Sequence, residues 1–220
     1  VTERMRMGGP TRRTPGEVIV DLYAGIGYYT IPFLVHGGAS CVHACEWNPN
    51  STTALKANLV RAGVRVLEGD PLALCGACVP PEAERQTWCQ VYEGDNSISA
   101  RVGGPLQSIA DRVSLGLIPS SIPGWPLGVT VLKHTGGMLH VHENVKDNEL
   151  DEWVNETCHT FEKLFAEKKI RYSAEEQTNY GHSTMLVRCV HLERVKSYAP
   201  HLYHVVADLE CTPVSGSSSL

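Results

Sequence analysis

The sequence predicts an α/β protein built on a mostly parallel sheet, and three features support this fold class. A short run of β-branched residues at 18–20 leads into Asp21, a turn with glycines at 25 and 27, and a helix-compatible stretch. The same succession of strand, turn and helix begins again at residue 41. The 220 residues, 42% of them hydrophobic, are enough for a sizeable core. Alternating strands and helices are typical of an open sheet that binds ligands beyond the carboxyl ends of its strands.

The first strand–helix turn has the spacing D-x-x-x-G-x-G from Asp21 to Gly27. Glycine accepts backbone angles that are closed to other residues and lets a ligand approach the main chain. The third glycine of the dinucleotide fingerprint would stand where this chain has Thr30, which argues against NAD. An acidic residue before the glycines repels phosphate and suits a cationic ligand without phosphates, such as S-adenosylmethionine. An ordinary turn with packing glycines is the alternative.

The second strand is expected at 41–46, and it ends in Glu46, 25 positions after the acidic residue of the first strand. A carboxylate there is placed to accept hydrogen bonds from both hydroxyls of a ribose. Either Asn48 or Asn50 is expected to cap the next helix, which is predicted at 51–61.

The next part of the sequence contains two strand-like runs that both end in Glu-Gly-Asp. A structureless loop as long as the stretch between them is uncommon inside a compact domain. We therefore expect the third strand at 91–95 and an insertion at 65–88, although Asp70 is the more ordinary end of that strand by its distance from the second. The pair Cys75 and Cys78 lies in this insertion, without the further ligands of a zinc site or the strand–helix setting of a redox motif.

The fourth strand is expected at 111–118 and runs into Pro119, Ser120 and Ser121, which form either a substrate loop or a simple strand-ending turn. The later elements are expected in the order of a helix at 125–134, a strand at 138–144, a long amphipathic helix at 147–169, and strands at 185–192 and 202–209. The last two strands fit an antiparallel hairpin that closes a seven-stranded sheet.

Two further groups of side chains are explained without a ligand. His140 and His142 lie on one face of the fifth strand, and a metal site would need a third ligand that the sequence does not identify. Structural or pocket-lining histidines are therefore expected, and a role for one of them as proton acceptor is only a guess. Lys163, Lys168 and Lys169 are expected on the solvated face of the long helix.

The chain fits one domain with short extensions. We expect an irregular lead-in at 1–16, a catalytic domain at 17–212 and a disordered Ser-rich tail at 213–220. No apolar run reaches about 18 residues, so no transmembrane helix is expected. The eight cysteines show no regular spacing, which predicts reduced thiols in a cytoplasmic protein.

Four segments, taken in order, resemble a known family. They are the glycine turn, Glu46-Trp47-Asn48-Pro49, Gly94-Asp95-Asn96 and Leu117-Ile118-Pro119-Ser120-Ser121. The chain is similar to the family that unites the archaeal-type guanine-37 methyltransferases of transfer RNA with the related wybutosine-synthesizing transferases. The resemblance covers most of residues 2–64 and 89–212. The Leu-Ile-Pro-Ser-Ser loop separates the chain from the methyltransferases, which carry Asn-Leu-Pro there.

This resemblance implies a Rossmann-like class I S-adenosylmethionine-dependent methyltransferase fold that does not transfer methyl. The expected reaction moves the 3-amino-3-carboxypropyl group of S-adenosylmethionine to the 4-demethylwyosine base at position 37 of phenylalanine tRNA and releases methylthioadenosine. A sulfonium activates all three attached carbons, so the carbon held in line with the nucleophile decides the product. Methyl transfer to guanine-37 and an inactive variant of the same fold are the alternatives.

The resemblance also implies roles for single residues. Glu46 is the expected ribose ligand, and Asp95 and Asn96 are the expected ligands on the adenine side. Cofactor contacts are further implied for Arg4, Asp21 and Gly25, and Pro119 and Ser120 are catalytic candidates. No metal is implied. The net charge of −5 does not favour RNA phosphates, so phenylalanine tRNA is expected to bind mostly through a region upstream of this sequence.

Overall fold

The computed structural model describes residues 16–67, 87–171 and 184–214. Its strands are β1 (Val18–Asp21), β2 (Cys41–Glu46), β3 (Arg65–Leu67), β4 (Trp88–Glu93), β5 (Arg112–Leu115), β6 (Gly137–Lys146), β7 (Thr184–Ala199) and β8 (Leu202–Val214). Its α-helices are α1 (Thr30–Val35), α2 (Pro49–Arg61), α3 (Asn96–Ser99), α4 (Trp125–Val131) and α5 (Leu150–Arg171), with short 3-10 helices at Ile122–Gly124 and Asp147–Glu149.

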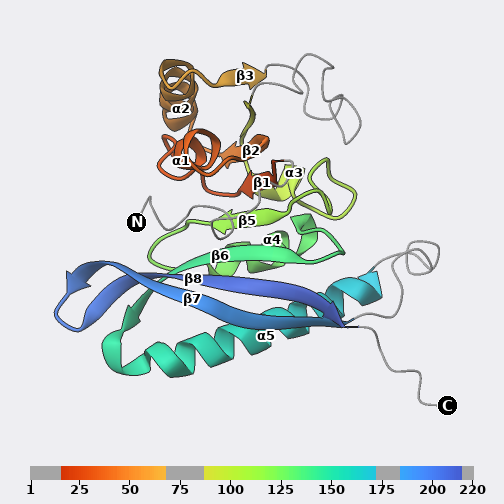
Figure 1. Cartoon of the computed structure of the whole chain (residues 1–220), viewed down its shortest axis with the longest axis vertical. Helices are drawn as coiled ribbons and strands as arrows, with labels where there is room; N and C mark the ends of the chain where they lie inside the picture. The colour runs from red at the N-terminus through yellow and green to blue at the C-terminus, as the bar shows by residue number, and fades with distance from the viewer. Residues whose placement is uncertain (1–15, 68–86, 172–183, 215–220) are drawn as a thin grey trace.

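These strands form one sheet in the order β3-β4-β2-β1-β5-β6-β8-β7 (Figure 1). The first six positions are parallel, and β8 pairs antiparallel with both β6 and β7. The predicted hairpin is therefore confirmed, and so is the mostly parallel α/β sheet. The hairpin is longer than expected, because β7 continues through 194–199 up to the turn at Pro200 and His201.

The described sheet has eight strands, so the prediction of seven was one too few. The third strand, expected at 91–95, is β4, which starts three residues earlier, ends at Glu93 and pairs with β2. The additional strand is β3, which pairs with β4 at the sheet edge because Val66 and Leu67 pack on apolar clusters of the core. Both ends of the predicted insertion at 65–88 are thus strands. Asp70, Cys75 and Cys78 lie outside the described residues.

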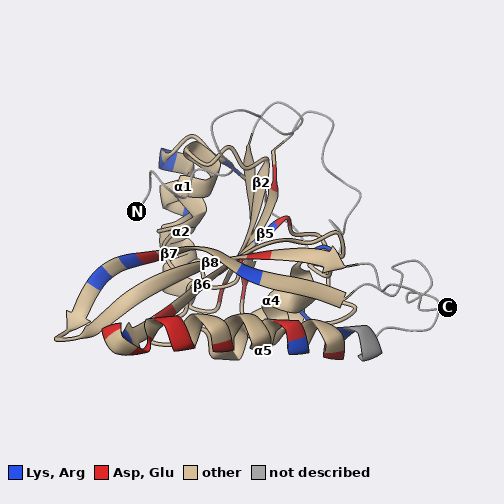
Figure 2. Ribbon diagram, turned by 60° about the horizontal axis from the view of Figure 1, so that its bottom comes forward, with Lys and Arg blue, Asp and Glu red and all other residues tan. Residues whose placement is uncertain are grey.

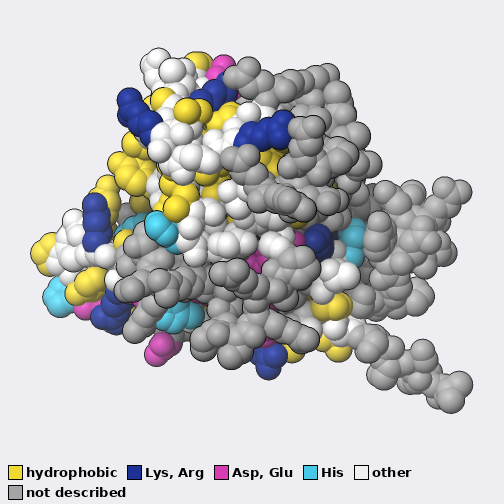
Figure 3. Space-filling view, turned by 45° about the horizontal axis from the view of Figure 1, so that its top comes forward, with side chains coloured by type: hydrophobic (Ala, Val, Ile, Leu, Met, Phe, Trp, Pro, Cys, Tyr) yellow, Lys and Arg dark blue, Asp and Glu magenta, His cyan; other side chains and the backbone are white. Residues whose placement is uncertain are grey.

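Alternation along the strands divides the core into two layers. Ile19 of β1 belongs to the cluster under α1 and α2, whereas its neighbour Val20 belongs to the cluster under α4 and α5. In the second layer the rings of Trp125 and Phe161 stack with centroids 4.8 Å apart and join the two helices. The outer surface over α1 and α2 carries exposed hydrophobic side chains (Figure 3).

Lys168 corrects one expectation about α5. Its side chain is buried, not solvated, and its Nζ donates to the backbone oxygens of Val129 at 2.7 Å and of Thr130 and Leu132 at 3.3 Å. These oxygens lie at the C-terminal end of α4, where carbonyl groups lack helical partners. Burial lowers the pKa of Lys168 to about 8. The lysine therefore joins α5 to α4.

No helix among the described residues is long and apolar enough to cross a membrane.

Candidate functional site

An open cavity of about 350 Å³ lies where β1, β2 and β4 end. Its lining residues are Leu22, Tyr23, Cys45, Glu46, Trp47, Gly94, Asp95 and Asn96. These strands are parallel neighbours, so their carboxyl ends meet at one edge of the sheet, where ligands of such folds bind. Three of the residues predicted from the sequence are thus brought together, namely Glu46, Asp95 and Asn96.

Glu46 is the last residue of β2, and its carboxylate joins two turns. Its Oε2 accepts the backbone N–H of Gly25 at 2.9 Å, and its Oε1 accepts the N–H of Asn48 at 2.9 Å. A carboxylate offers about four lone-pair sites, so each oxygen keeps capacity for another donor. The residue is 9% exposed, which leaves it accessible from the cavity while the two N–H groups fix its orientation. This geometry is suited to two adjacent hydroxyl groups.

The two glycines of the turn have different roles. Gly25 has a φ of +55°, and a Cβ placed there would meet nothing within 4 Å. Its backbone thus lies beside open space, which leaves room for a ligand, although Gly25 is not one of the residues that line the cavity. Gly27 has a φ of +101°, and a Cβ there would meet side-chain atoms of Ile31 and Leu55 at 2.9 Å. Gly27 is therefore a packing glycine, as the alternative interpretation proposed, whereas Gly25 is not.

Asp21 lies beneath this turn and is not one of the residues that line the cavity. Its side chain is 1% exposed, and its Oδ2 accepts the hydroxyl of Thr30 at 2.7 Å. Burial raises the pKa of Asp21, although the hydrogen bonds from Thr30 and the Tyr23 backbone act in the opposite direction. The structure thus gives Asp21 a bracing position between β1 and α1. Arg4 lies outside the described residues.

Asp95 and Asn96 begin α3 on the opposite wall. The Asp95 side chain accepts the N–H of Ser97 at 2.8 Å, and this bond is the main reason that the pKa of Asp95 lies below its usual value. Asn96 donates through Nδ2 to the backbone oxygen of Leu22 at 2.9 Å. Both side chains are therefore held in place by hydrogen bonds, Asp95 within its own turn and Asn96 to the residue after β1.

Sequence reasoning missed two aromatic residues of the cavity, Trp47 and Tyr23. Trp47 follows Glu46 directly and is 74% exposed, so a broad apolar ring stands free at the mouth of the cavity. Burial raises the pKa of the Tyr23 hydroxyl, which keeps this group protonated at neutral pH. The signal was present in the sequence, because each residue adjoins or nearly adjoins a predicted acidic strand end.

The Pro119–Ser121 loop follows β5 at the same edge of the sheet but does not line this cavity. Ser120 Oγ donates to Glu143 Oε2 at 2.9 Å, and the buried Ser121 Oγ accepts from the indole N–H of Trp125 at 3.0 Å. The oxygen of Pro119 accepts the N–H of Asn144 at 2.9 Å. These bonds tie the loop to β6 and α4.

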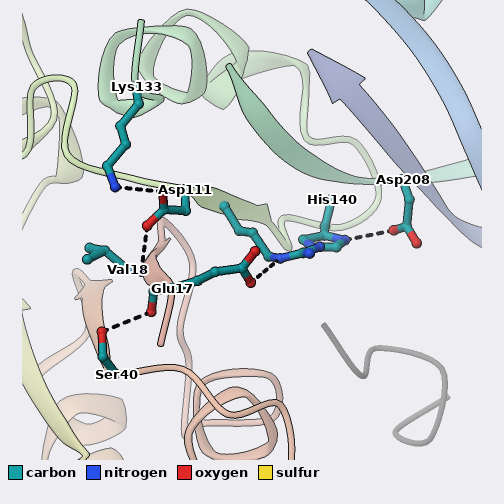
Figure 4. A network of polar contacts seen from close by, with 8 residues as sticks. Glu17, Val18, Ser40, Asp111, Lys133, His140 and Asp208 are labelled. Carbon is teal, nitrogen blue, oxygen red and sulfur yellow. Dashed lines mark hydrogen bonds and ion pairs between the residues drawn. The ribbon is translucent and has the colours of Figure 1, made fainter. Parts of the chain in front are cut away.

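The strand histidines are buried and paired with β8. His140 Nδ1 lies 2.7 Å from Asp208 Oδ1 (Figure 4), and His142 Nδ1 lies 3.1 Å from His204 Nε2. Burial lowers the pKa of His142 to about 3, so this ring is neutral and a poor proton acceptor. Among the described residues no three His, Cys, Asp or Glu side chains form a group that could hold a metal ion. The expectation of structural histidines is thus supported by the geometry.

Known proteins are similar in sequence to this chain over nearly its whole length. The profile described as the TRM5/TYW2 methyltransferase domain matches residues 1–71. The tRNA wybutosine-synthesizing protein 2 homolog of Mus musculus is 38% identical and that of Danio rerio is also 38% identical, over 99% and 97% of this chain and 50% of each relative. The chain therefore spans about half the length of the curated relatives it matches.

Solved structures show the same fold. TYW2 of P. horikoshii in complex with MeSAdo matches with a TM-score of 0.62 and 24% identity, over 96% of this chain and 61% of that one. TYW2 of M. jannaschii in complex with AdoMet matches with a TM-score of 0.62 and 23% identity, over 97% and 74%. The tRNA m1G37 methyltransferase of M. jannaschii matches with a TM-score of 0.58 and 17% identity, over 96% of this chain and 48% of that one. The predicted Rossmann-like methyltransferase fold is confirmed, and the chain belongs to the TRM5/TYW2 family.

Proposed function

We propose that this chain is the catalytic domain of a transferase that uses S-adenosylmethionine to modify transfer RNA. The proposed reaction transfers the 3-amino-3-carboxypropyl group to the 4-demethylwyosine base at position 37 of phenylalanine tRNA, in wybutosine biosynthesis, and releases methylthioadenosine. The observation that carries the proposal is the pairing of Glu46 with the open bend at Gly25, at the edge of the sheet where ligands bind. The names of the relatives at 38% identity support the choice of reaction.

The residues of the cavity fit S-adenosylmethionine. Glu46 would accept the ribose hydroxyls, and Trp47 offers a flat apolar ring next to it. Asp95 and Asn96 would hold the adenine side, and Gly25 leaves room for the ligand at the bend. The AdoMet and MeSAdo complexes of the archaeal TYW2 structures support this ligand class. Arg4 remains part of the proposal through the family resemblance alone.

Bound S-adenosylmethionine would supply a sulfonium whose attached carbons are all electrophilic. In the proposed transfer one S–C bond breaks as the bond to the base forms, and the base loses a proton. The contribution of the protein is to orient the donor, since only the carbon held in line at near-attack distance reacts. Asp21, buried under the turn, fixes the bend that sets this orientation, and the Pro119–Ser120 loop is the proposed support for the incoming base.

The domain organisation belongs to the same proposal. The proposed catalytic domain spans 17–212. The strands narrow the other predicted boundaries, because 65–67 belong to β3, Trp88 to β4 and 213–214 to β8, so an insertion would lie within 68–87 and a tail after 214. The lead-in predicted at 1–16 lies almost entirely outside the described residues. Phenylalanine tRNA would bind through its anticodon loop, mostly to a region that precedes this domain in the full protein. The proposed location is the cytoplasm, where the tRNA substrate is available.

The by-product of the reaction tests the proposal. The chain, joined to the half of a relative that it does not match, is incubated with S-adenosylmethionine and phenylalanine tRNA that carries 4-demethylwyosine, and the small molecules are separated by chromatography. We expect methylthioadenosine. S-adenosylhomocysteine would instead identify a guanine-37 methyltransferase. If S-adenosylmethionine gives neither product nor a rise in melting temperature, the chain is an inactive variant of the fold.

A further inference from the structure

The β7–β8 hairpin projects beyond the other strands on the cavity side of the sheet. β6 is paired with β5 only as far as Val141, opposite Leu115, but it continues to Lys146, opposite Leu202 of β8. Five further residues at about 3.3 Å each carry the hairpin about 17 Å past the carboxyl end of β5. Figure 1 shows the turn of this hairpin extending past the remaining strands. It lies at the same edge as the glycine turn.

The projecting part of β7 carries exposed cations next to aromatic rings. The guanidinium of Arg194 lies 5.2 Å from the ring centroid of Tyr203, and Nζ of Lys196 lies 5.7 Å from that of Tyr198. Tyr198 is 60% exposed. Figure 2 shows basic residues on β7 close to its turn. The end of the hairpin, defined by Arg194, Lys196, Tyr198 and Tyr203, is called the basic tip below.

The cations of the basic tip make no direct ion pair with any residue that the structure describes, although the pKa of Asp147 is lowered by the hydrogen bond from His201 and, to a smaller extent, by the charge of Arg194. Among the described residues, no carboxylate lies within ion-pair distance of Arg194 or Lys196. The nearby carboxylate of Asp147 is bonded to His201 at 2.9 Å, and the neighbouring Lys146 is already paired with Glu149 at 2.8 Å. The tip therefore presents two exposed cations without a direct ion pair in the described part of the chain, on a protein whose net charge is −5.

A bulge distributes these cations over both faces of the hairpin. Arg194 stands opposite Val205, and Lys196 stands opposite His204, so one residue between them is unpaired. Adjacent residues of a strand point to opposite faces, and Val205 and His204 are adjacent. Arg194 thus shares a face with Tyr203, whereas Lys196 lies on the other face with Tyr198. A strand of polyanion that passes over the tip meets a cation and a ring on either side.

We propose that the basic tip is a contact surface for single-stranded RNA, in which Arg194 and Lys196 bind phosphates and Tyr198 stacks on a base. Phosphate contacts supply most of the affinity of RNA-binding proteins, and unpaired bases stack on exposed aromatic side chains. The inference rests on the proposed function, because the tip adjoins the edge where a tRNA base would enter. It gives the acidic domain its own contact to the RNA loop.

The test measures binding of a phenylalanine tRNA anticodon stem-loop to the chain by fluorescence anisotropy at several salt concentrations. The double variant Arg194→Gln/Lys196→Gln is compared with the control Arg61→Gln/Lys163→Gln, which removes the same charge from exposed positions on α2 and α5. We expect about tenfold weaker binding for the first, with the slope of log affinity against log salt reduced by about 1.4, and no change for the control.

Tyr198 provides an independent readout. Tyr198→Leu is expected to weaken binding at least about fivefold, whereas Tyr198→Phe keeps the stacking ring and stays close to wild type. Equal RNA affinities for the two double variants would overturn the inference, and so would a wild-type chain that does not bind the stem-loop at low salt. S-adenosylmethionine affinity is measured in parallel. If the wild-type chain does not bind S-adenosylmethionine but its RNA binding still depends on the tip, the proposed function is rejected and the inference about the RNA contact surface is retained.

Discussion

Replacement of Glu46 by alanine tests the site most directly. The change removes the acceptor of two backbone N–H groups at 2.9 Å and the proposed acceptor of the ribose hydroxyls. Hydrogen bonds to a charged group contribute about 1.5–3 kcal/mol, so the dissociation constant for S-adenosylmethionine should rise about 10- to 150-fold. Glu46→Gln should be intermediate, because one of its two terminal groups is an N–H donor that faces another donor.

Isothermal titration calorimetry with S-adenosylmethionine measures this change well below the melting temperature. The matched control is Glu93→Ala, which removes a carboxylate from the residue of β4 directly opposite Glu46 but outside the cavity lining. The control should change affinity less than about threefold. If Glu46→Ala and Glu93→Ala bind equally well, the ribose assignment is wrong, and the cavity needs another ligand.

Three further outcomes are expected. Gly25→Ala should lower the free energy of unfolding in urea by about 1–2 kcal/mol and also weaken the binding of S-adenosylmethionine. The control is Gly38→Ala, because Gly38 also has a positive φ and open space around its Cβ position, and it should lower stability by a similar amount without affecting binding. Asn48→Ala removes the acceptor of the Asn50 N–H at the start of α2 and should lower stability by about 1 kcal/mol, while Asn50→Ala should not. The pKa of His142 is about 3 when folded and about 6.5 when unfolded, so stability is lost as pH falls below 6.5. His142→Phe should therefore reduce the loss between pH 6.5 and 5 by about 1.6 kcal/mol. An unchanged loss would mean that this ring does not titrate on unfolding.

Much of the fold was predictable because local sequence and topology agree. The β-branched run, the glycine turn and the acid at the end of β2 each specify a local structure that the parallel sheet also requires. Asn48 was one of two candidate caps, and it is the residue that accepts a bond at the start of α2. The cavity position of Glu46 follows from the same logic, since a strand end has a known place in such a sheet.

Other features depend on contacts that sequence spacing does not encode. Asp21 turns toward Thr30 and away from the cavity lining because a buried hydroxyl is available to it. Lys168 is drawn inward by three carbonyl oxygens at the end of α4, a helix distant in sequence. β3 is only three residues long, too short for a pattern, and it is a strand because β4 offers it a free edge.

The position of β3 has a consequence for variation in chain length. The chain leaves this edge strand at Leu67 and enters β4 at Trp88, at the amino end of β4, whereas the ligand cavity adjoins the carboxyl end of the same strand. Residues gained or lost between the two strands therefore need not displace Gly94 or Asp95. The pairing of β4 with β2, including the bond from the N–H of Gly94 to the oxygen of Glu46 at 2.9 Å, holds this wall of the pocket independently of the number of residues between Leu67 and Trp88.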